Sequence, residues 1–193
     1  MLFENNIIKI DKVPNVLDDL VLEFTGILSK HYGYVIISGY VAILLGRARA
    51  TEDIDILIEK KNGKVFSKFW KSIIKNKFYC LNTENLDEAW SYLEEGLAIR
   101  FAKTNTVIPN FEIKFPKNEL EHLALKEKLT VQLPKGSIFI PEIEQQIAVK
   151  RILLASRKDI EDAIHLEELF KEKLNNKKLL QYTELCKRIK NQP

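Results

Sequence analysis

The stretch between residues 34 and 58 constrains the fold and chemistry of this chain more than any other. It consists of an apolar run, a tight Ser38-Gly39 turn, a short helical pattern and a second apolar run that carries Asp53 and Asp55. Side chains two residues apart in a strand point to the same face, so the two carboxylates project together while the isoleucine between them enters the core. Like charges on one face repel each other unless a cation lies between them, and oxygen pairs of this kind hold Mg²⁺ for phosphate chemistry. The stretch therefore predicts a metal site on a core strand.

The alternative interpretation of Asp53 and Asp55 is a solvated strand face, although acidic residues are depleted in strands. A metal site needs further oxygen ligands, and the run Phe111-Glu-Ile-Lys-Phe115 supplies one in Glu112. By alternation the apolar residues of this run face inward and Glu112 points the other way. Alone, Glu112 would be a surface residue. Together with the two aspartates it becomes the candidate third ligand or catalytic base.

The Ser38-Gly39 turn joins a strand to a helix. A small residue followed by glycine lets the backbone approach a ligand, and the free N–H groups at the start of a helix suit a phosphate. Turns of this kind also occur for packing reasons alone, so both interpretations stay open. Arg47 and Arg49 precede the aspartate strand, and an arginine can contact phosphate through two parallel hydrogen bonds.

These residues carry a family resemblance. Ser38-Gly39, thirteen intervening residues and then Asp53-Ile-Asp55-Ile resemble the signature of the DNA polymerase β-like nucleotidyltransferase superfamily. The segment Arg49-Ala-Thr51-Glu-Asp53 is similar to that of small prokaryotic members, the minimal nucleotidyltransferases and the abortive-infection (AbiEii-like) toxins. Ser38 departs from the pattern, because it replaces the usual first glycine. A second pattern, Glu142…Lys150…Arg157-Lys-Asp159…Asp162, is similar to the C-terminal part of the AbiEii-like group.

The resemblance implies an α+β nucleotidyltransferase fold with a mixed β-sheet, flanking helices and a C-terminal helical part. It implies that Asp53, Asp55 and Glu112 bind Mg²⁺ or Mn²⁺ and carry catalysis. The expected nucleotide-binding residues are Ser38, Gly39, Arg49, Thr51 and Lys150.

The implied reaction is transfer of an NMP from an NTP, with ATP binding among the expectations, to a protein hydroxyl or an RNA acceptor. Members of the family sometimes act in toxin–antitoxin or defence systems, which implies a possible cognate partner protein. Nothing in the sequence chooses the NTP or the acceptor. The alternative is a catalytically weak nucleotide-binding or interaction module of the same fold.

Helical spacing gives a further observation on the second pattern. At about 100° per residue, Lys150 falls beside the apolar stripe of its helix, and Asp159 and Asp162 share a face with apolar residues of the next helix. A lysine in that position must either extend to water or find an anionic partner. Lys150 is therefore either a phosphate contact or a structural lysine. The two aspartates either stabilise a helix N-terminus or pair with Lys150 or an arginine.

The periodicity predicts a core over residues 1–140 that begins with an N-terminal helix, and a helical region over residues 141–193 packed on it. Helices are expected from the residues after Pro14 to near Gly33, and over 40–45, from Asn62-Gly63, over 86–94, over 118–128 and from Pro141 onward with a break at Asn175-Asn176. Strands are expected over 34–37, 53–58, 97–102, 107–115, 130–133 and 137–140.

Composition bounds the remaining possibilities. The 193 residues are 46% hydrophobic and 30% charged, which is typical of a folded globular protein, and the net charge of +3 is only mildly basic. Cys80 and Cys186 match no zinc or redox spacing, so we expect free thiols, with a single disulfide as the less favoured case. His31, His122 and His165 show no metal-ligand spacing either.

The chain shows neither a secretory signal nor an apolar run of the roughly 18 residues that a membrane helix needs. We therefore expect a soluble cytoplasmic protein without a membrane partner. The lysine-rich tail from Lys171 onward is typical of a solvated helix face. It would indicate RNA binding only if its side chains lined the cleft.

Overall fold

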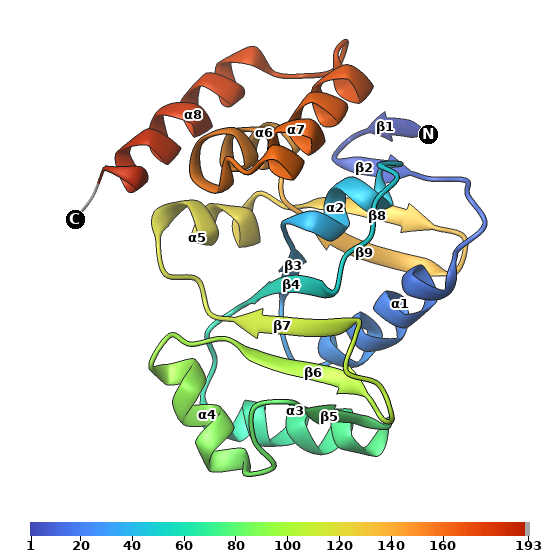
Figure 1. The fold of residues 1–193 in the computed structure, drawn as a ribbon, viewed down its shortest axis with the longest axis vertical. Helices are drawn as coiled ribbons and strands as arrows, with labels where there is room; N and C mark the ends of the chain where they lie inside the picture. The colour runs from blue at the N-terminus through green and yellow to red at the C-terminus, as the bar shows by residue number, and fades with distance from the viewer. Residues whose placement is uncertain (192–193) are drawn as a thin grey trace.

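Two mixed β-sheets form the frame of the molecule in the computed structural model, which describes residues 1–191. The larger sheet contains, in order, β3 (Tyr34–Ile36), β4 (Asp53–Ile58), β7 (Asn110–Lys114), β6 (Ile99–Lys103) and β5 (Phe78–Cys80). β4 and β7 run parallel, and the other neighbours are antiparallel. The first predicted motif thus lies at the junction of β3, the following helix and β4, inside the larger sheet (Figure 1).

The smaller sheet contains β1 (Leu2–Glu4), β2 (Ile7–Lys9), β8 (Leu129–Leu133) and β9 (Gly136–Ile140) in that order. β2 pairs with β8 in parallel, although more than a hundred residues separate them along the chain. β1, β2 and β5 were not expected, since strands of three residues are too short to show an alternating pattern. Their partners satisfy their backbone hydrogen bonds: β2 pairs with the distant β8 and β5 with β6, whereas β1 pairs with the neighbouring β2 across the Asn5-Asn6 turn.

Helices surround both sheets. They are α1 (Val16–Leu28), α2 (Gly39–Leu44), α3 (Gly63–Lys75), α4 (Leu86–Glu94), α5 (Glu119–Lys126), α6 (Ile143–Val149), α7 (Arg157–Phe170) and α8 (Asn176–Lys190). Asparagine or serine side chains accept a hydrogen bond from the first turn of six of these helices, which fixes where each begins. α6, α7 and α8 gather at one end of the molecule, and α3 and α4 lie at the other (Figure 1).

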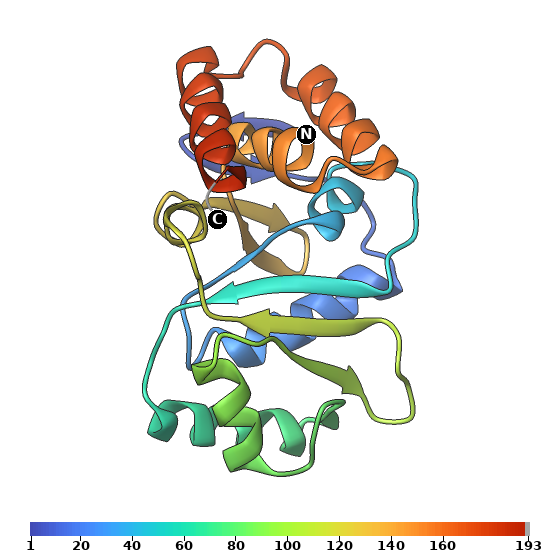
Figure 2. The ribbon, with the colours of Figure 1, turned by 60° about the vertical axis from the view of Figure 1, so that its left-hand side comes forward.

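One face of the larger sheet packs on α1 and α3. Phe24 of α1 stacks on Phe111 of β7 with 3.9 Å between ring centroids, and Phe69 of α3 lies edge-on to Phe24. Ile54 and Ile56 of β4 are fully buried on this face. Strand alternation therefore directs Asp53 and Asp55 to the opposite face. In Figure 2, α1 lies behind β4 and β7.

The opposite face is covered only in part. Near the end of β4, Leu57 packs with Val35 of β3 and Ala124 of α5 in a small separate apolar cluster. Apolar residues of α6 and α7, such as Ile147 and Leu166, belong to the same core cluster as the sheets. The predicted division at residue 140 stays a prediction.

The helix expected from Pro141 onward is interrupted earlier than predicted. After α6 the chain forms a π-helical segment, η1 (Lys150–Leu154), closed by a hydrogen bond of 2.9 Å from the Ala155 N–H to the Lys150 carbonyl. Ala155 then has a φ of 51° in the left-handed region, which ends the helix. No glycine or proline marks this break, and the local signal for it is Ser156, whose side chain caps the start of α7.

The remaining expectations concern class, membrane and thiols. The predicted α+β class is confirmed, and β4 and α4 have the predicted bounds. None of the helices within residues 1–191 is long and apolar enough to cross a membrane. Cys80 and Cys186 are both buried free thiols.

Candidate functional site

Pairing of β4 with β7 brings the predicted acids onto neighbouring strands. Asp55 lies opposite Glu112, and Asp53 lies opposite Asn110. Asp53 and Asp55 of β4 lie on the sheet face opposite α1 and α3. Glu112 projects on the same face, because its neighbours Phe111 and Ile113 are fully buried on the core side. The sheet register therefore assembles one acidic face from residues more than fifty positions apart.

Asp55 is the electrostatic centre of this face. Burial raises its pKa, the negative charges of Asp53 and Glu112 raise it further, and the pKa reaches about 6. The Ser38 side chain, as a hydrogen-bond partner, and the charge of Lys114 act in the opposite direction without cancelling the rise. A nearby positive charge would therefore stabilise the ionised form of this half-buried carboxylate, which lies beside two like charges.

Glu112 already has a cationic partner. Arg100 of β6, directly opposite Glu112 in the strand pair, places Nη2 2.6 Å and Nε 2.8 Å from its Oε2. Arg100 is half exposed, and the carboxylate of Glu112 is mostly covered. Sequence reasoning missed Arg100, because only the β6–β7 register brings it to the acidic face.

Asp53 is held by its neighbour in the preceding loop. The Thr51 hydroxyl donates to the Asp53 carbonyl at 2.9 Å and lies 3.3 Å from its Oδ1. Thr51 was expected to bind nucleotide. The observed contacts orient the first acid of the face. A nucleotide contact of Thr51 stays a prediction.

The donor set suits a hard divalent cation at Asp53 and Asp55. Carboxylate oxygens are the ligands that Mg²⁺ prefers, and such an ion would offset the negative charges of Asp53 and Glu112, which together with burial raise the pKa of Asp55. Glu112 would join as a ligand only by turning its carboxylate from Arg100. Across residues 1–191, no three His, Cys, Asp or Glu side chains stand together as a ready metal-binding group.

The turn before α2 is backbone-strained at Ser38. This residue has a φ of 61° and a ψ of −132°, a combination that favours glycine. Ser38 is the position where the resembled signature has glycine. At the next residue, Gly39, an added Cβ would lie 2.6 Å from Arg49 Nη2, so a side chain there would displace the Arg49 guanidinium. The Arg49 guanidinium therefore lies directly over the Ser38-Gly39 turn.

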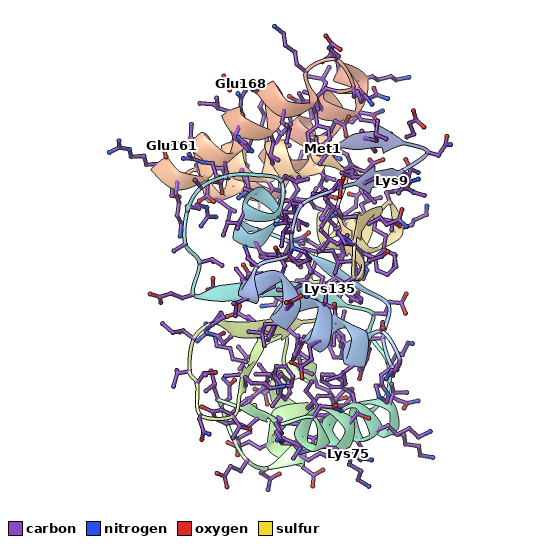
Figure 3. The ribbon with its side chains drawn as sticks, turned by 90° about the vertical axis from the view of Figure 1, so that its right-hand side faces the viewer. Met1, Lys9, Lys75, Lys135, Glu161 and Glu168 are labelled. Atoms are coloured by element: carbon purple, nitrogen blue, oxygen red, sulfur yellow. The ribbon has the colours of Figure 1, made fainter. Side chains whose placement is uncertain are left out.

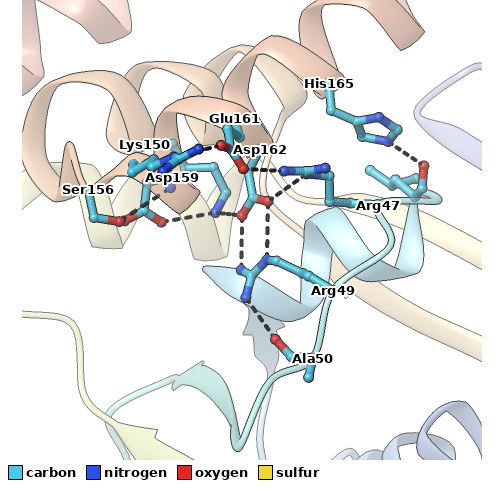
Figure 4. Close-up of polar contacts among 11 residues, drawn as sticks. Arg47, Arg49, Ala50, Lys150, Ser156, Asp159, Glu161, Asp162 and His165 are labelled. Atoms are coloured by element: carbon cyan, nitrogen blue, oxygen red, sulfur yellow. Dashed lines mark hydrogen bonds and ion pairs between the residues drawn. The ribbon is translucent and has the colours of Figure 1, made fainter.

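Arg49 is held there by Asp162 of α7. Its Nε and Nη2 donate to the two carboxylate oxygens at 3.1 and 2.9 Å, and Nη1 donates to the Ala50 carbonyl at 3.2 Å (Figure 4). Lys150 Nζ donates to the same Asp162 carboxylate at 2.9 Å and lies 3.5 Å from Asp159. We call Arg49, Lys150, Asp159 and Asp162 the ion cluster.

Further contacts join α7 to the loop after α2. Arg47 Nη2 lies 2.6 Å from Glu161, and its Nε lies 3.5 Å from Asp162. His165 Nε2 is 3.0 Å from the Leu45 carbonyl (Figure 4). The C-terminal helices are therefore attached to the loop between the Ser38-Gly39 turn and the acids of β4.

Lys150 lies inside the ion cluster and not on the acidic face. It is fully buried, as is Asp162. Burial by itself raises the pKa of Asp162, but hydrogen bonds from Arg49 and Lys150 outweigh this and leave the pKa below its ordinary value. Of the two interpretations left open by the sequence, this geometry favours a structural lysine. A phosphate contact of Lys150 stays a prediction.

A cavity of about 160 Å³ adjoins the turn on the side of α5 and α6. Its walls include Ser38, Leu57, Lys114 and Gln146, so it lies along the same sheet face as Asp55 and Glu112. It is smaller than the roughly 300–1,000 Å³ of sites that enclose a drug-sized ligand. It has room for one ring of a ligand whose remainder lies outside.

Comparison with known proteins identifies the type of fold. No family model and no curated protein sequence matches the chain. Among solved structures, the chain matches an antigenic nucleotidyltransferase-like protein from Paracoccidioides brasiliensis, with a TM-score of 0.50 and 16% sequence identity. The match covers 89% of this chain and 86% of the other. The chain therefore has a nucleotidyltransferase-like α+β fold with mixed sheets and C-terminal helices.

The strain at Ser38 predicts the effect of two substitutions. Ser38→Gly should stabilise the protein by about 1 kcal/mol, because glycine adopts the observed φ and ψ without steric cost. Ser38→Ala keeps the Cβ and loses only the hydroxyl, so it should give no such gain. Urea unfolding of both variants measures the difference. Equal stability of the two variants would contradict the conclusion that the Ser38 backbone is strained.

Asp55→Asn should change how stability depends on pH. The pKa of Asp55 is raised from 3.8 to about 6, so only well below pH 3.8 is the group protonated in both states and without effect on stability. Between these values the unfolded chain ionises first, and stability falls as pH rises through 6. At pH 7.5 with EDTA, Asp55→Asn should therefore be more stable than wild type by about 1–2 kcal/mol.

Thermal or urea unfolding at pH 4 and at pH 7.5 tests this prediction. The two proteins should differ much less in stability at the lower pH, and Asp11→Asn, which removes an exposed carboxylate, serves as the control. A less stable Asp55→Asn variant at pH 7.5 would be inconsistent with a repulsive acidic face.

The ion cluster predicts an asymmetry between its members. Asp162→Asn leaves Lys150 buried with only the more distant Asp159, so it should cost about 3–5 kcal/mol. Lys150→Met should cost clearly less, because Asp162 keeps both hydrogen bonds from Arg49. Urea unfolding at pH 7 compares them, and the reverse order would show that Lys150 dominates the cluster.

Proposed function

We propose that this chain is a divalent-metal-dependent nucleotidyltransferase that transfers an NMP from an NTP to a hydroxyl group of a protein or an RNA. The observation that carries the proposal is the juxtaposition of Asp53, Asp55 and Glu112 with the strained Ser38-Gly39 turn on a nucleotidyltransferase-like fold. The resemblance of the motif to small prokaryotic members extends the proposal to a toxin–antitoxin or defence system with a cognate partner protein.

In this proposal Asp53 and Asp55 hold Mg²⁺ or Mn²⁺, and Glu112 joins them when it leaves Arg100. The ion supplies positive charge to the triphosphate and the reacting oxygens. The raised pKa of Asp55 supports this assignment, because a cation would offset the burial and the neighbouring negative charges that raise it. Glu112, once free, is also the carboxylate placed to accept the proton of the attacking hydroxyl.

The Ser38-Gly39 turn holds the phosphates. Its backbone N–H groups are the proposed donors, and the absence of a side chain at Gly39 lets the Arg49 guanidinium lie against the turn. The Arg49 guanidinium adds a positive charge over the turn, while its Nε and Nη2 stay bonded to Asp162. Arg49 therefore acts through charge. The cavity beside Ser38 is the proposed place for the base or the ribose.

Lys150 acts indirectly in this scheme. Its ammonium is enclosed with Asp162 and Asp159, so it fixes the carboxylate that in turn fixes Arg49. Lys150 and Asp162 are then positioning residues for the phosphate turn.

A non-catalytic nucleotide-binding module is the second candidate. One observation favours it: the carboxylate expected to act as base is bound to Arg100 through two short contacts. Removal of this partner separates the two candidates. If Arg100 restrains an active enzyme, Arg100→Ala should increase transfer several-fold, whereas a binding module should show no transfer with or without Arg100.

Radiolabelled transfer tests the proposed reaction. The purified chain is incubated with each of the four α-³²P-labelled NTPs, with Mg²⁺ or Mn²⁺, and with separate protein and RNA fractions of a cell lysate. Label should move to one acceptor class, and transfer should fall at least about 100-fold in Asp53→Asn and Asp55→Asn, as expected when a metal-held transition state is lost. Asp11→Asn is the matched control. NTP-induced thermal stabilisation without any transfer would support the binding module.

A further inference from the structure

The largest charge imbalance of the chain lies on and around α3. Residues 60–77 contain seven lysines, and no Asp or Glu occurs between residues 60 and 83. The whole chain carries a net charge of +3, so the residues outside this segment together carry −4. The small net charge therefore hides a strongly basic segment in an otherwise slightly acidic protein.

Four lysines form a row along the outer side of α3. Lys64, Lys68, Lys71 and Lys75 are spaced by four, three and four residues, which places them on one helix face, and all four are exposed. The opposite side of α3 is buried through Phe66, Phe69, Trp70 and Ile73. At 1.5 Å per residue the row is about 16 Å long. Lys75 lies at the end of the molecule formed by α3 (Figure 3).

The four lysines of the row lack acidic partners. Within residues 1–191, no ion pair or side-chain hydrogen bond involves any of them, whereas other surface lysines such as Lys135 and Lys187 lie 2.8 and 2.7 Å from a carboxylate. Like charges three and four residues apart destabilise a helix. The row therefore costs stability, and no contact within the described chain compensates for it.

Two more lysines extend the basic surface to the end of α1. Lys30 follows α1, and Lys61 donates to the His31 carbonyl at 2.9 Å, beside the first turns of α3. Burial, followed by the charges of Lys30, Lys68 and Lys61, lowers the pKa of His31, which indicates that these charges converge. We call Lys30, Lys61, Lys64, Lys68, Lys71 and Lys75 the lysine surface.

We propose that the lysine surface binds the phosphate backbone of an RNA strand. A row of point charges without aromatic groups suits a line of phosphates, and the length of the row matches a few phosphates of one strand. Protein interfaces are depleted in lysine, which argues against a protein partner. Interfacial membrane helices bury an apolar face in lipid, but that face of α3 is already used in the core.

The choice of RNA over DNA rests on the proposed function, in which RNA is one of the acceptors. The surface lies on the helix-covered side of the large sheet, and the acids lie on the other face. An RNA bound here would be held on the enzyme without occupying the acidic face. The lysine surface then contributes affinity and not sequence recognition.

The test is binding of a fluorescently labelled 20-nucleotide single-stranded RNA to the full chain, measured by anisotropy without NTP at 50–200 mM salt. Wild type should bind with a log–log salt slope that is steeper by about three than that of the quadruple variant Lys64→Gln/Lys68→Gln/Lys71→Gln/Lys75→Gln. The quadruple variant should bind at least tenfold more weakly at 50 mM salt. The corresponding Lys→Arg variant should retain binding, because it keeps the charges.

The matched control removes four exposed lysines from the C-terminal tail, as Lys171→Gln/Lys177→Gln/Lys187→Gln/Lys190→Gln. It changes net charge equally and should lose less than threefold in affinity. The α3 variant should unfold at the same or higher temperature than wild type, since it removes like-charge repulsion, so lost binding cannot be attributed to unfolding.

Three results would overturn the proposal: equal losses in both quadruple variants, tighter binding to DNA of the same sequence, or binding to vesicles containing phosphatidylserine but not to RNA. Asp11→Asn, which removes an exposed carboxylate outside the site, should keep full RNA affinity. RNA binding without any NMP transfer would count against the proposed enzyme and leave this inference standing, whereas transfer to a protein with no RNA binding would do the reverse.

Discussion

The rest of the structure depends on the alternation of buried and charged residues along β4. Ile54 and Ile56 are fully buried against α1 and α3, and Asp53 and Asp55 occupy the other face. A slip of one residue in the pairing with β7 would bury the acids and expose the isoleucines, so the hydrophobic core fixes the register. The register in turn places Asp55 opposite Glu112. Packing that stabilises the fold therefore holds together carboxylates that repel each other.

Asp162 and Asp55 have opposite electrostatic surroundings. Asp162 is saturated by Arg49 and Lys150, and its pKa lies below the ordinary value although burial acts to raise it. Asp55 lacks such partners, and its pKa rises to about 6. The first arrangement anchors the C-terminal helices over the Ser38-Gly39 turn, and the second leaves charge unbalanced. Unbalanced charge and backbone strain that meet at one place are typical of functional sites, because ligand binding can relieve both.

Charge is also distributed unevenly between the two faces of the large sheet. The acidic face lies on one side, and the basic helix α3 packs on the other through its apolar residues. The separation keeps the lysines of α3 from neutralising the acids. Each surface therefore keeps an electrostatic potential of its own sign, which can attract a ligand of opposite charge. Two cations nevertheless reach the acidic face: Arg100 pairs with Glu112, and the charge of Lys114 acts on Asp55.

The sequence by itself determined the elements whose signals are local. Alternating isoleucines and acids gave β4, helix-capping residues and apolar periodicity gave α3 and α4, and the Ser38-Gly39 spacing gave the strand–turn–helix unit. It also predicted the acidic pair, because side-chain direction in a strand follows from its period of two. Only the tertiary structure decided what depends on contacts between distant segments: the parallel pairing of β2 with β8, the pairing of Arg100 with Glu112, and the enclosure of Lys150 beside Asp162. A short strand or a buried lysine gains its stability from partners far along the chain, and no local pattern encodes which partner will be there.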